Sequence, residues 1–147
     1  VAAYLKATHE IGARTSRETI QMRPVISSWT ALLAYVRQQL QHEPREQFRV
    51  LFLDRKNQLI ADEQMSQGTV NEAPVYPREI ARRALELSAS ALILVHNHPS
   101  GDPTPSREDV SMTHKLIAAL EPVSISVHDH LIIGRHKAVS LRAEGLI

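Results

Sequence analysis

The chain has 147 residues, of which 43% are hydrophobic and 22% charged, and its formal net charge is +1. This composition is that of an ordinary globular domain, and it excludes a disordered or fibrous chain. The near-neutral charge gives no support for a protein that grips nucleic acid through its phosphates, and the absence of cysteine excludes disulfides and zinc sites built on thiolates.

The first half of the chain predicts two helices followed by a hairpin of strands. Helical spacing of apolar residues is weak over 2–20 and clear over 27–41, where Trp29 should lie in the core. The apolar stripe of this second helix consists of Trp29, Leu32, Leu33, Val36 and Leu40. The period then changes to two, which predicts a strand over 46–54 paired with an antiparallel strand over 58–66.

The second half of the chain alternates helices and strands. The predicted elements are a helix over 78–87, a buried strand over 90–98, a helix over 106–120, one or two strands within 123–134 and a last short strand over 138–145. We therefore expect an α/β fold in which a mixed sheet is sandwiched by helices. This domain should cover residues 27–147, with residues 1–26 as a separate N-terminal helical segment.

Two histidines one residue apart stand at the end of the buried strand. Alternation along a strand places His96 and His98 on one face, roughly 6.6–6.8 Å apart, with Asn97 pointing to the other face. A loop rich in proline follows, and Asp109 comes three residues after Ser106, in the first turn of the next helix. Two imidazoles and a carboxylate are ligands that suit a zinc ion in a protein without cysteine.

Ser106 and Asp109 also have a structural interpretation. Ser-x-x-Asp at a helix start resembles a capping box, and an acid there suits the helix dipole. Taken singly, each residue is better explained as a cap than as part of a site. Asp102 is the competing carboxylate, but it precedes Pro103 and is expected to cap the turn. The long spaced pattern as a whole favours a metal site over chance.

The stretch "HNHPSGDPTPSRED" resembles the signature of the JAMM, or MPN-plus, metalloproteases, in which His-x-His is followed by seven residues and Ser-x-x-Asp. The residues between the motif positions are similar to those of the RadC branch of that superfamily. Further similar segments between about residue 45 and residue 147 are "FRVLFLD", "GT", "YPREI" and "DHLIIG". The resemblance implies the layered MPN architecture, which is like that of the cytidine deaminases. It also implies that residues 1–26 are the remnant of a helix-hairpin-helix-type region.

The resemblance further implies that His96, His98 and Asp109 bind one zinc ion per chain, with a water as the fourth ligand. It implies that Ser106 hydrogen-bonds this water or the developing oxyanion, and that an upstream glutamate at the start of a strand is the general base. We choose Glu46 as this base, because it directly precedes the first predicted strand segment; without the resemblance it would be a solvated residue of a polar linker. The competing glutamates are Glu43, Glu63, Glu72 and Glu79.

The other histidines receive structural interpretations. His128 and His130 form a second His-x-His, but no Ser-x-x-Asp follows it. We interpret Asp129 and His130 as a structural pair, with the orientation of a ligand imidazole as the alternative. Surface positions are expected for His9, His42, His114 and His136.

The resemblance implies a zinc-dependent hydrolase of amide or isopeptide bonds that acts on a peptide or protein substrate. RadC-like proteins are traditionally labelled DNA repair proteins, so a DNA-processing accessory protein without peptidase activity is the alternative. Only 4% of the residues are aromatic, so a stacking platform for nucleic acid is not indicated. A non-catalytic scaffold is a third possibility, against which the presence of all four motif positions argues. A zinc deaminase is excluded, because its signature requires Pro-Cys-x-x-Cys.

A membrane protein is not expected. The longest uninterrupted apolar run is Ala91–Val95, whereas a spanning helix needs roughly 20 apolar residues. No charged-then-apolar segment resembles a signal peptide, and we expect a cytoplasmic location. Because the chain opens on Val1 rather than Met, we also expect further residues upstream.

Overall fold

The computed structural model describes residues 28–68 and 75–147. The predicted N-terminal helical segment, His9 and Glu72 lie outside these residues. The elements in chain order are α2 (Trp29–Leu40), β1 (Glu46–Leu53), β2 (Leu59–Gly68), α3 (Pro77–Glu86), β3 (Ala91–Asn97), α4 (Arg107–Leu120), the 3-10 helix η2 (Glu121–Val123), β4 (Ser126–Ile133) and β5 (Ala138–Ser140).

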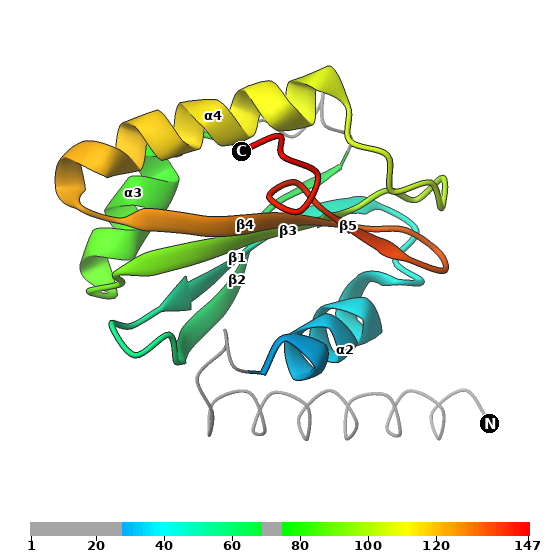
Figure 1. Cartoon of the computed structure of the whole chain (residues 1–147), viewed down its shortest axis with the longest axis horizontal. Coiled ribbons are helices and arrows are strands. Elements are labelled where there is room, and N and C mark those ends of the chain that lie inside the picture. The colour runs from blue at the N-terminus through cyan, green and yellow to red at the C-terminus, as the bar shows by residue number, and fades with distance from the viewer. Residues whose placement is uncertain (1–27, 69–74) are drawn as a thin grey trace.

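The strands form one five-stranded sheet in the order β2-β1-β3-β4-β5. β1 is antiparallel to β2 and to β3, β3 and β4 are parallel, and β5 is antiparallel to β4. Helix α2 covers one face of the sheet, and α3 and α4 cover the other (Figure 1). The predicted α/β fold, a mixed sheet with helices on both faces, is confirmed.

The two central strands are buried on both faces. Every residue of β3 is buried, which is why its sequence is a continuous apolar run. Ile93 and Val95 of β3 pack with Leu51 beneath α2, whereas Leu92 and Leu94 pack on the side of α3 and α4. The alternation predicted from the sequence therefore assigns each apolar residue of β3 to a defined face of the sheet. The same alternation determines the face to which the histidines point.

The prediction that Trp29 lies in the core is wrong, because its side chain is 39% exposed. The buried residues of α2 are Leu32, Tyr35, Val36 and Leu40, and Leu33 is only partly buried. The buried stripe is rotated toward Tyr35, whose hydroxyl donates a hydrogen bond to the carboxylate of Asp62 on β2. The buried face of α2 thus includes a tyrosine with a polar partner, which hydrophobicity alone did not indicate.

The last strand is shorter than predicted. β5 ends at Ser140, where the Oγ of this serine bonds the carboxylate of Asp129, and the chain then turns. The same carboxylate accepts the N–H of Arg142, which holds the turn against β4. In the described part of the chain, no helix combines the length and the hydropathy needed to cross a bilayer.

Candidate metal centre

The candidate site lies where β3 ends, β1 begins and α4 starts. The last pair of the β1–β3 ladder joins Phe48 to His96. Residues directly opposite each other on antiparallel strands share a face. Continuing the same register two residues outward brings Glu46 opposite His98. Glu46 thus faces the two histidines because of the strand register, although fifty residues separate them in sequence.

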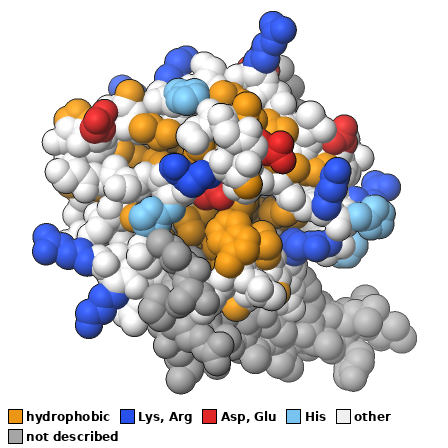
Figure 2. All heavy atoms as spheres, in the orientation of Figure 1, with side chains coloured by type: hydrophobic (Ala, Val, Ile, Leu, Met, Phe, Trp, Pro, Cys, Tyr) orange, Lys and Arg blue, Asp and Glu red, His pale blue; other side chains and the backbone are white. Residues whose placement is uncertain are grey.

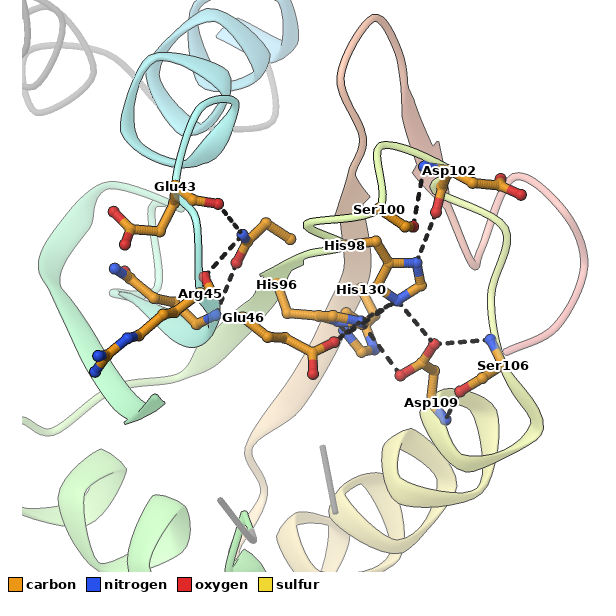
Figure 3. A network of polar contacts seen from close by, with 12 residues as sticks. Glu43, Arg45, Glu46, His96, His98, Ser100, Asp102, Ser106, Asp109 and His130 are labelled. Carbon is orange, nitrogen blue, oxygen red and sulfur yellow. Dashed lines mark hydrogen bonds and ion pairs between the residues drawn. The ribbon is translucent and has the colours of Figure 1, made fainter. Parts of the chain in front are cut away.

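The polar atoms of four side chains converge at this point (Figure 3). The Nε2 atoms of His96 and His98 are 2.9 Å apart. Asp109 places Oδ1 3.2 Å from Nε2 of His96 and Oδ2 3.4 Å from Nε2 of His98. The Oε1 atom of Glu46 lies 3.9 Å from both Nε2 atoms. The structure therefore brings together the three predicted ligands and the predicted base.

The hydrogen bonds of His98 show which nitrogen faces the site. Its Nδ1 atom lies 2.8 Å from the carbonyl oxygen of Asp102. A carbonyl only accepts, so Nδ1 carries a proton, and in the neutral imidazole Nε2 then presents a lone pair to the site. The carboxylate of Asp102 accepts from the N–H and hydroxyl of Thr104. Asp102 therefore caps the turn, as predicted, and its backbone orients the imidazole.

His96 is oriented by a buried chain of hydrogen bonds. The Thr113 hydroxyl donates to the carbonyl of Asp109 at 2.6 Å, and its oxygen therefore accepts from Nδ1 of His130, also at 2.6 Å. With Nδ1 as the donor, Nε2 of His130 accepts from Nδ1 of His96 at 2.7 Å. In its neutral form His96, like His98, thus turns the lone pair of Nε2 toward the site. Of the two interpretations of His130, the geometry matches the orientation of His96.

Two lone pairs and a carboxylate that face one another need a cation between them. Burial acts to raise the pKa of Asp109, but its hydrogen bonds with His96, His98 and the N–H of Ser106 outweigh burial and hold this pKa far below the usual range. The hydrogen bond with Asp109 raises the pKa of His98, although partial burial opposes it. Burial lowers the pKa of His130 far below its usual value, so it is neutral. A proton or a metal ion can supply the missing charge.

Ser106 is the N-cap of α4. Its Oγ accepts the N–H of Asp109 at 3.0 Å, and its own N–H donates to Oδ2 of Asp109 at 2.7 Å. The capping box that the sequence suggested is therefore present with aspartate at the third position. The cap and the site are not alternatives, because the same carboxylate closes the box and faces the two histidines.

The described competitors of Glu46 have other partners. Glu63 forms an ion pair with Arg83 at 2.7 Å, and Glu79 contacts Arg82 on the exposed side of α3. Glu43 lies in the loop before β1. Its carboxylate does not belong to the described group of residues that could hold a metal ion, which consists of Glu46, His96 and His98. As predicted, exposed positions are found for His42, His114 and His136.

Two residues at the site were not assigned a function from the sequence. Thr113 lies one turn after Asp109 on α4, and this spacing is the signal that could have identified it. Asn97 points to the other face, as predicted, but its contacts with the loop before β1 required the tertiary structure.

A cleft of about 610 Å³ opens beside the site. It is lined by Pro44, Arg45, Glu46, Gly68, His98, Pro99 and Ser100. The imidazole of His98 and the carboxylate of Glu46 are 16% and 15% exposed, whereas those of His96 and Asp109 are each 2% exposed. The site is therefore deep on the side of α4 and reachable from the cleft.

The chain is similar in sequence to known proteins along nearly its whole length. The family model described as "RadC-like JAB domain" matches residues 26–146. A UPF0758 protein of Rhodobacter capsulatus is 56% identical over the whole chain, which covers 69% of that relative. A UPF0758 protein of Ruegeria pomeroyi is 56% identical over 97% of the chain, which covers 64% of that relative. The chain thus spans about two thirds of the length of these relatives.

Proposed function

The chain belongs to the RadC-like JAB domain family, and from this premise we propose that it is a zinc-dependent hydrolase of amide or isopeptide bonds. The observation that carries the proposal is the convergence of the Nε2 atoms of two imidazoles and one carboxylate, with a second carboxylate 3.9 Å from both nitrogens. Three ligands and a nearby acid are the set that a catalytic zinc site needs, because one coordination position must stay open.

The spacing of the donor atoms supports zinc. Bonds of about 2.0–2.1 Å in a tetrahedron put neighbouring ligand atoms roughly 3.3 Å apart. The separations among His96, His98 and Asp109 are 2.9, 3.2 and 3.4 Å. Glu46 lies farther from both imidazoles than Asp109 does, which favours a task at the reacting water over direct ligation.

In the proposed reaction, each residue of the site has a separate role. A bound zinc ion lowers the pKa of a coordinated water toward ~7 and polarises the carbonyl of the substrate. Glu46 takes the proton of the attacking water and delivers it to the leaving amine. Ser106 accepts the N–H of Asp109 through Oγ, which leaves its hydroxyl proton for donation to the oxyanion. His130 and the carbonyl of Asp102 keep both imidazoles in the tautomer that ligation requires.

A peptide or protein substrate is part of the proposal. The cleft that reaches Glu46 and His98 has a volume of about 610 Å³. This volume lies within the range of ~300–1,000 Å³ that ligand pockets occupy. Entry from the cleft side would bring a carbonyl first to Glu46 and His98, the two more exposed members of the site.

The test combines metal analysis with cleavage of a fluorogenic peptide library that contains both α-peptide and lysine isopeptide bonds. We expect about one zinc per chain and measurable cleavage, lost in Glu46→Gln while zinc is retained. Glu43→Gln is the matched control, since it removes an acid three residues away, in the loop that leads into β1. A protein that stays free of zinc under zinc-replete conditions, or equal activity of the Glu46→Gln variant, would contradict the proposal.

The DNA-related alternative has weaker support. On the face shown in Figure 2, Lys and Arg side chains are spread singly with acidic side chains between them, and they form no continuous basic stripe. Binding through phosphates would weaken steeply with salt. Titration of duplex and single-stranded DNA at about 50 mM salt, with this chain and with a longer relative, tests it; absence of binding ends the alternative.

A further inference from the structure

We infer that Asn97 is a positioning residue that holds Glu46 beside the metal ligands. Asn97 stands between the two histidines in the sequence, but its side chain points to the opposite face of the sheet and is 2% exposed. It is not among the residues that line the cleft. The inference rests on the proposed function, because Asn97 is assigned a part in catalysis only through the base.

The carboxamide of Asn97 contacts both peptide groups that flank Glu46. Its Oδ1 accepts the N–H of Gln47 at 2.7 Å. Its Nδ2 donates to the carbonyl of Arg45 at 3.0 Å and, more weakly, to the carbonyl of Glu43 at 3.3 Å (the dashed lines at Glu43 and Arg45 in Figure 3). One bond lies on each side of Glu46, so the direction of its Cα–Cβ bond is restrained from both neighbours.

The β1–β3 ladder does not supply this restraint. Pairing of β1 with β3 ends at Phe48 and His96, so Glu46 and Gln47 lie beyond the last pair. On the other side, the β1–β2 ladder continues to Gln47 paired with Gln67 and Glu46 paired with Gly68, which holds the segment on the β2 side only. Asn97 replaces the missing backbone partner on the β3 side. A misplacement of about 1 Å in a catalytic group can cost roughly 100-fold in rate, so this replacement has a direct effect on catalysis.

The chemistry of the contact requires an amide. Asparagine accepts and donates at once, whereas aspartate could serve Gln47 but would face two carbonyl oxygens without a proton to offer. Leucine has a similar size and offers neither group. Both substitutions lie on the face away from the three metal ligands. Asn97→Leu and Asn97→Asp should therefore release Glu46 while they leave the zinc ligands in place.

The control is Val95→Ala. Val95 is on the same strand and the same face, two residues earlier, is fully buried and packs only in the apolar cluster under α2. This variant removes packing from the same part of the core and leaves the hydrogen bonds of Asn97 to Arg45 and Gln47 in place. It therefore separates loss of packing from loss of the positioning contact.

The experiment follows the amide hydrogen exchange of Gln47 by NMR in zinc-loaded protein, together with zinc content and kinetics on the peptide library. In Asn97→Leu, we expect Gln47 to exchange at least about tenfold faster while zinc stays near one per chain. We also expect kcat to fall about 100-fold with KM unchanged. Val95→Ala should keep the wild-type exchange of Gln47 and the wild-type kcat. Unchanged exchange or unchanged kcat in folded, zinc-loaded Asn97→Leu overturns the inference.

Two further measurements keep the inference testable if a variant does not fold or the wild type cleaves nothing. In the wild-type chain, the carboxamide protons of Asn97 should exchange slowly, and fast exchange overturns the inference. In a crystal structure of zinc-loaded Asn97→Asp, the Glu46 carboxylate should leave its position 3.9 Å from the two Nε2 atoms; an unmoved carboxylate overturns it. A zinc-loaded wild type without activity counts against the proposed function alone.

Discussion

The chain contains two His-x-His segments on neighbouring parallel strands, and the structure uses them differently. At the end of β3, His96 and His98 point to one face with their Nε2 atoms 2.9 Å apart. Within β4, His130 is completely buried and bonds His96, whereas His128 bonds the side chain of Asn57 in the β1–β2 turn. One segment presents two nitrogens to a site, and the other supplies one support and one structural contact.

A break in the ladder explains the difference. The β3–β4 register passes from Leu92 paired with Val127 directly to Ile93 paired with Asp129. His128 is the extra residue of this bulge, and a bulge removes the shared face that spacing by two creates in a regular strand. The comparison teaches that His-x-His makes a ligand pair only where the ladder is regular and the strand end is open.

The largest expected effect is the loss of metal from the first segment but not from the second. His96→Ala should reduce zinc from about one per chain to less than about a tenth, because two ligands do not hold the ion against dialysis. His128→Ala should retain full zinc content. Metal analysis after dialysis against a weak chelator measures both. Equal loss in the two variants would remove the distinction between the segments.

A smaller effect is expected where the second segment supports the first. Thr113→Val removes the hydroxyl that accepts from Nδ1 of His130, and His130 then no longer holds His96 in one tautomer. Loss of such a support typically lowers metal affinity about 10–100-fold. Competition with a fluorescent chelator gives the Kd, and His128→Gln is the control. A Thr113→Val variant with the wild-type Kd would show that the hydrogen-bonded chain does not matter for binding.

The loop between β3 and α4 gives the next prediction. A Cβ atom at Gly134 would lie 2.6 Å from the carbonyl oxygen of Gly101 and 2.7 Å from Cδ of Pro103. Gly134→Ala should therefore push this loop outward and move the Asp102 carbonyl away from His98. We expect the free energy of unfolding to fall by about 1–3 kcal/mol, together with weaker zinc binding. Urea unfolding of metal-free protein separates the two effects; an unchanged midpoint would contradict the contact.

The smallest expected effect is a pH dependence at His128. Burial, and then the charge of Arg142, lower the pKa of His128 in the folded state below its ordinary value of about 6.5. Protonation therefore favours the unfolded chain: the stabilising contribution is complete above pH ~6.5 and declines as the pH falls toward the lowered pKa. His128→Asn should lose less stability than the wild type between pH ~6.5 and 5. Parallel pH slopes in thermal unfolding would contradict this.

The sequence predicted what depends on local periodicity. The spacing by two along the buried strand placed His96 and His98 on one face and Asn97 on the other, and the helix start placed Asp109 in the first turn. These relations involve neighbours in sequence only. They hold whatever the rest of the chain does, because strand alternation and helix capping are local.

What the sequence did not predict depends on pairing between distant segments. Glu46 was chosen through the family resemblance and not from local periodicity, and its position follows from the register of β1 on β3. The separate behaviour of His128 follows from a bulge that no local pattern marks. The burial of Trp29 was predicted wrongly: the buried face of α2 includes Tyr35, whose hydroxyl bonds Asp62 on β2, and leaves Trp29 partly exposed. Each of these outcomes was decided by a partner many residues away.

The contacts of Asp109 form a closed ring. Its backbone carbonyl accepts a hydrogen bond from the Thr113 hydroxyl, further hydrogen bonds lead through His130 to His96, and Nε2 of His96 lies 3.2 Å from the carboxylate of the same aspartate. A cation bound between Asp109 and His96 would close this ring of contacts and tie α4 to β3 and, through His130, to β4. Metal occupancy would then report whether α4 is seated on the sheet, and stability would rise with free metal concentration as RT ln(1 + [metal]/Kd).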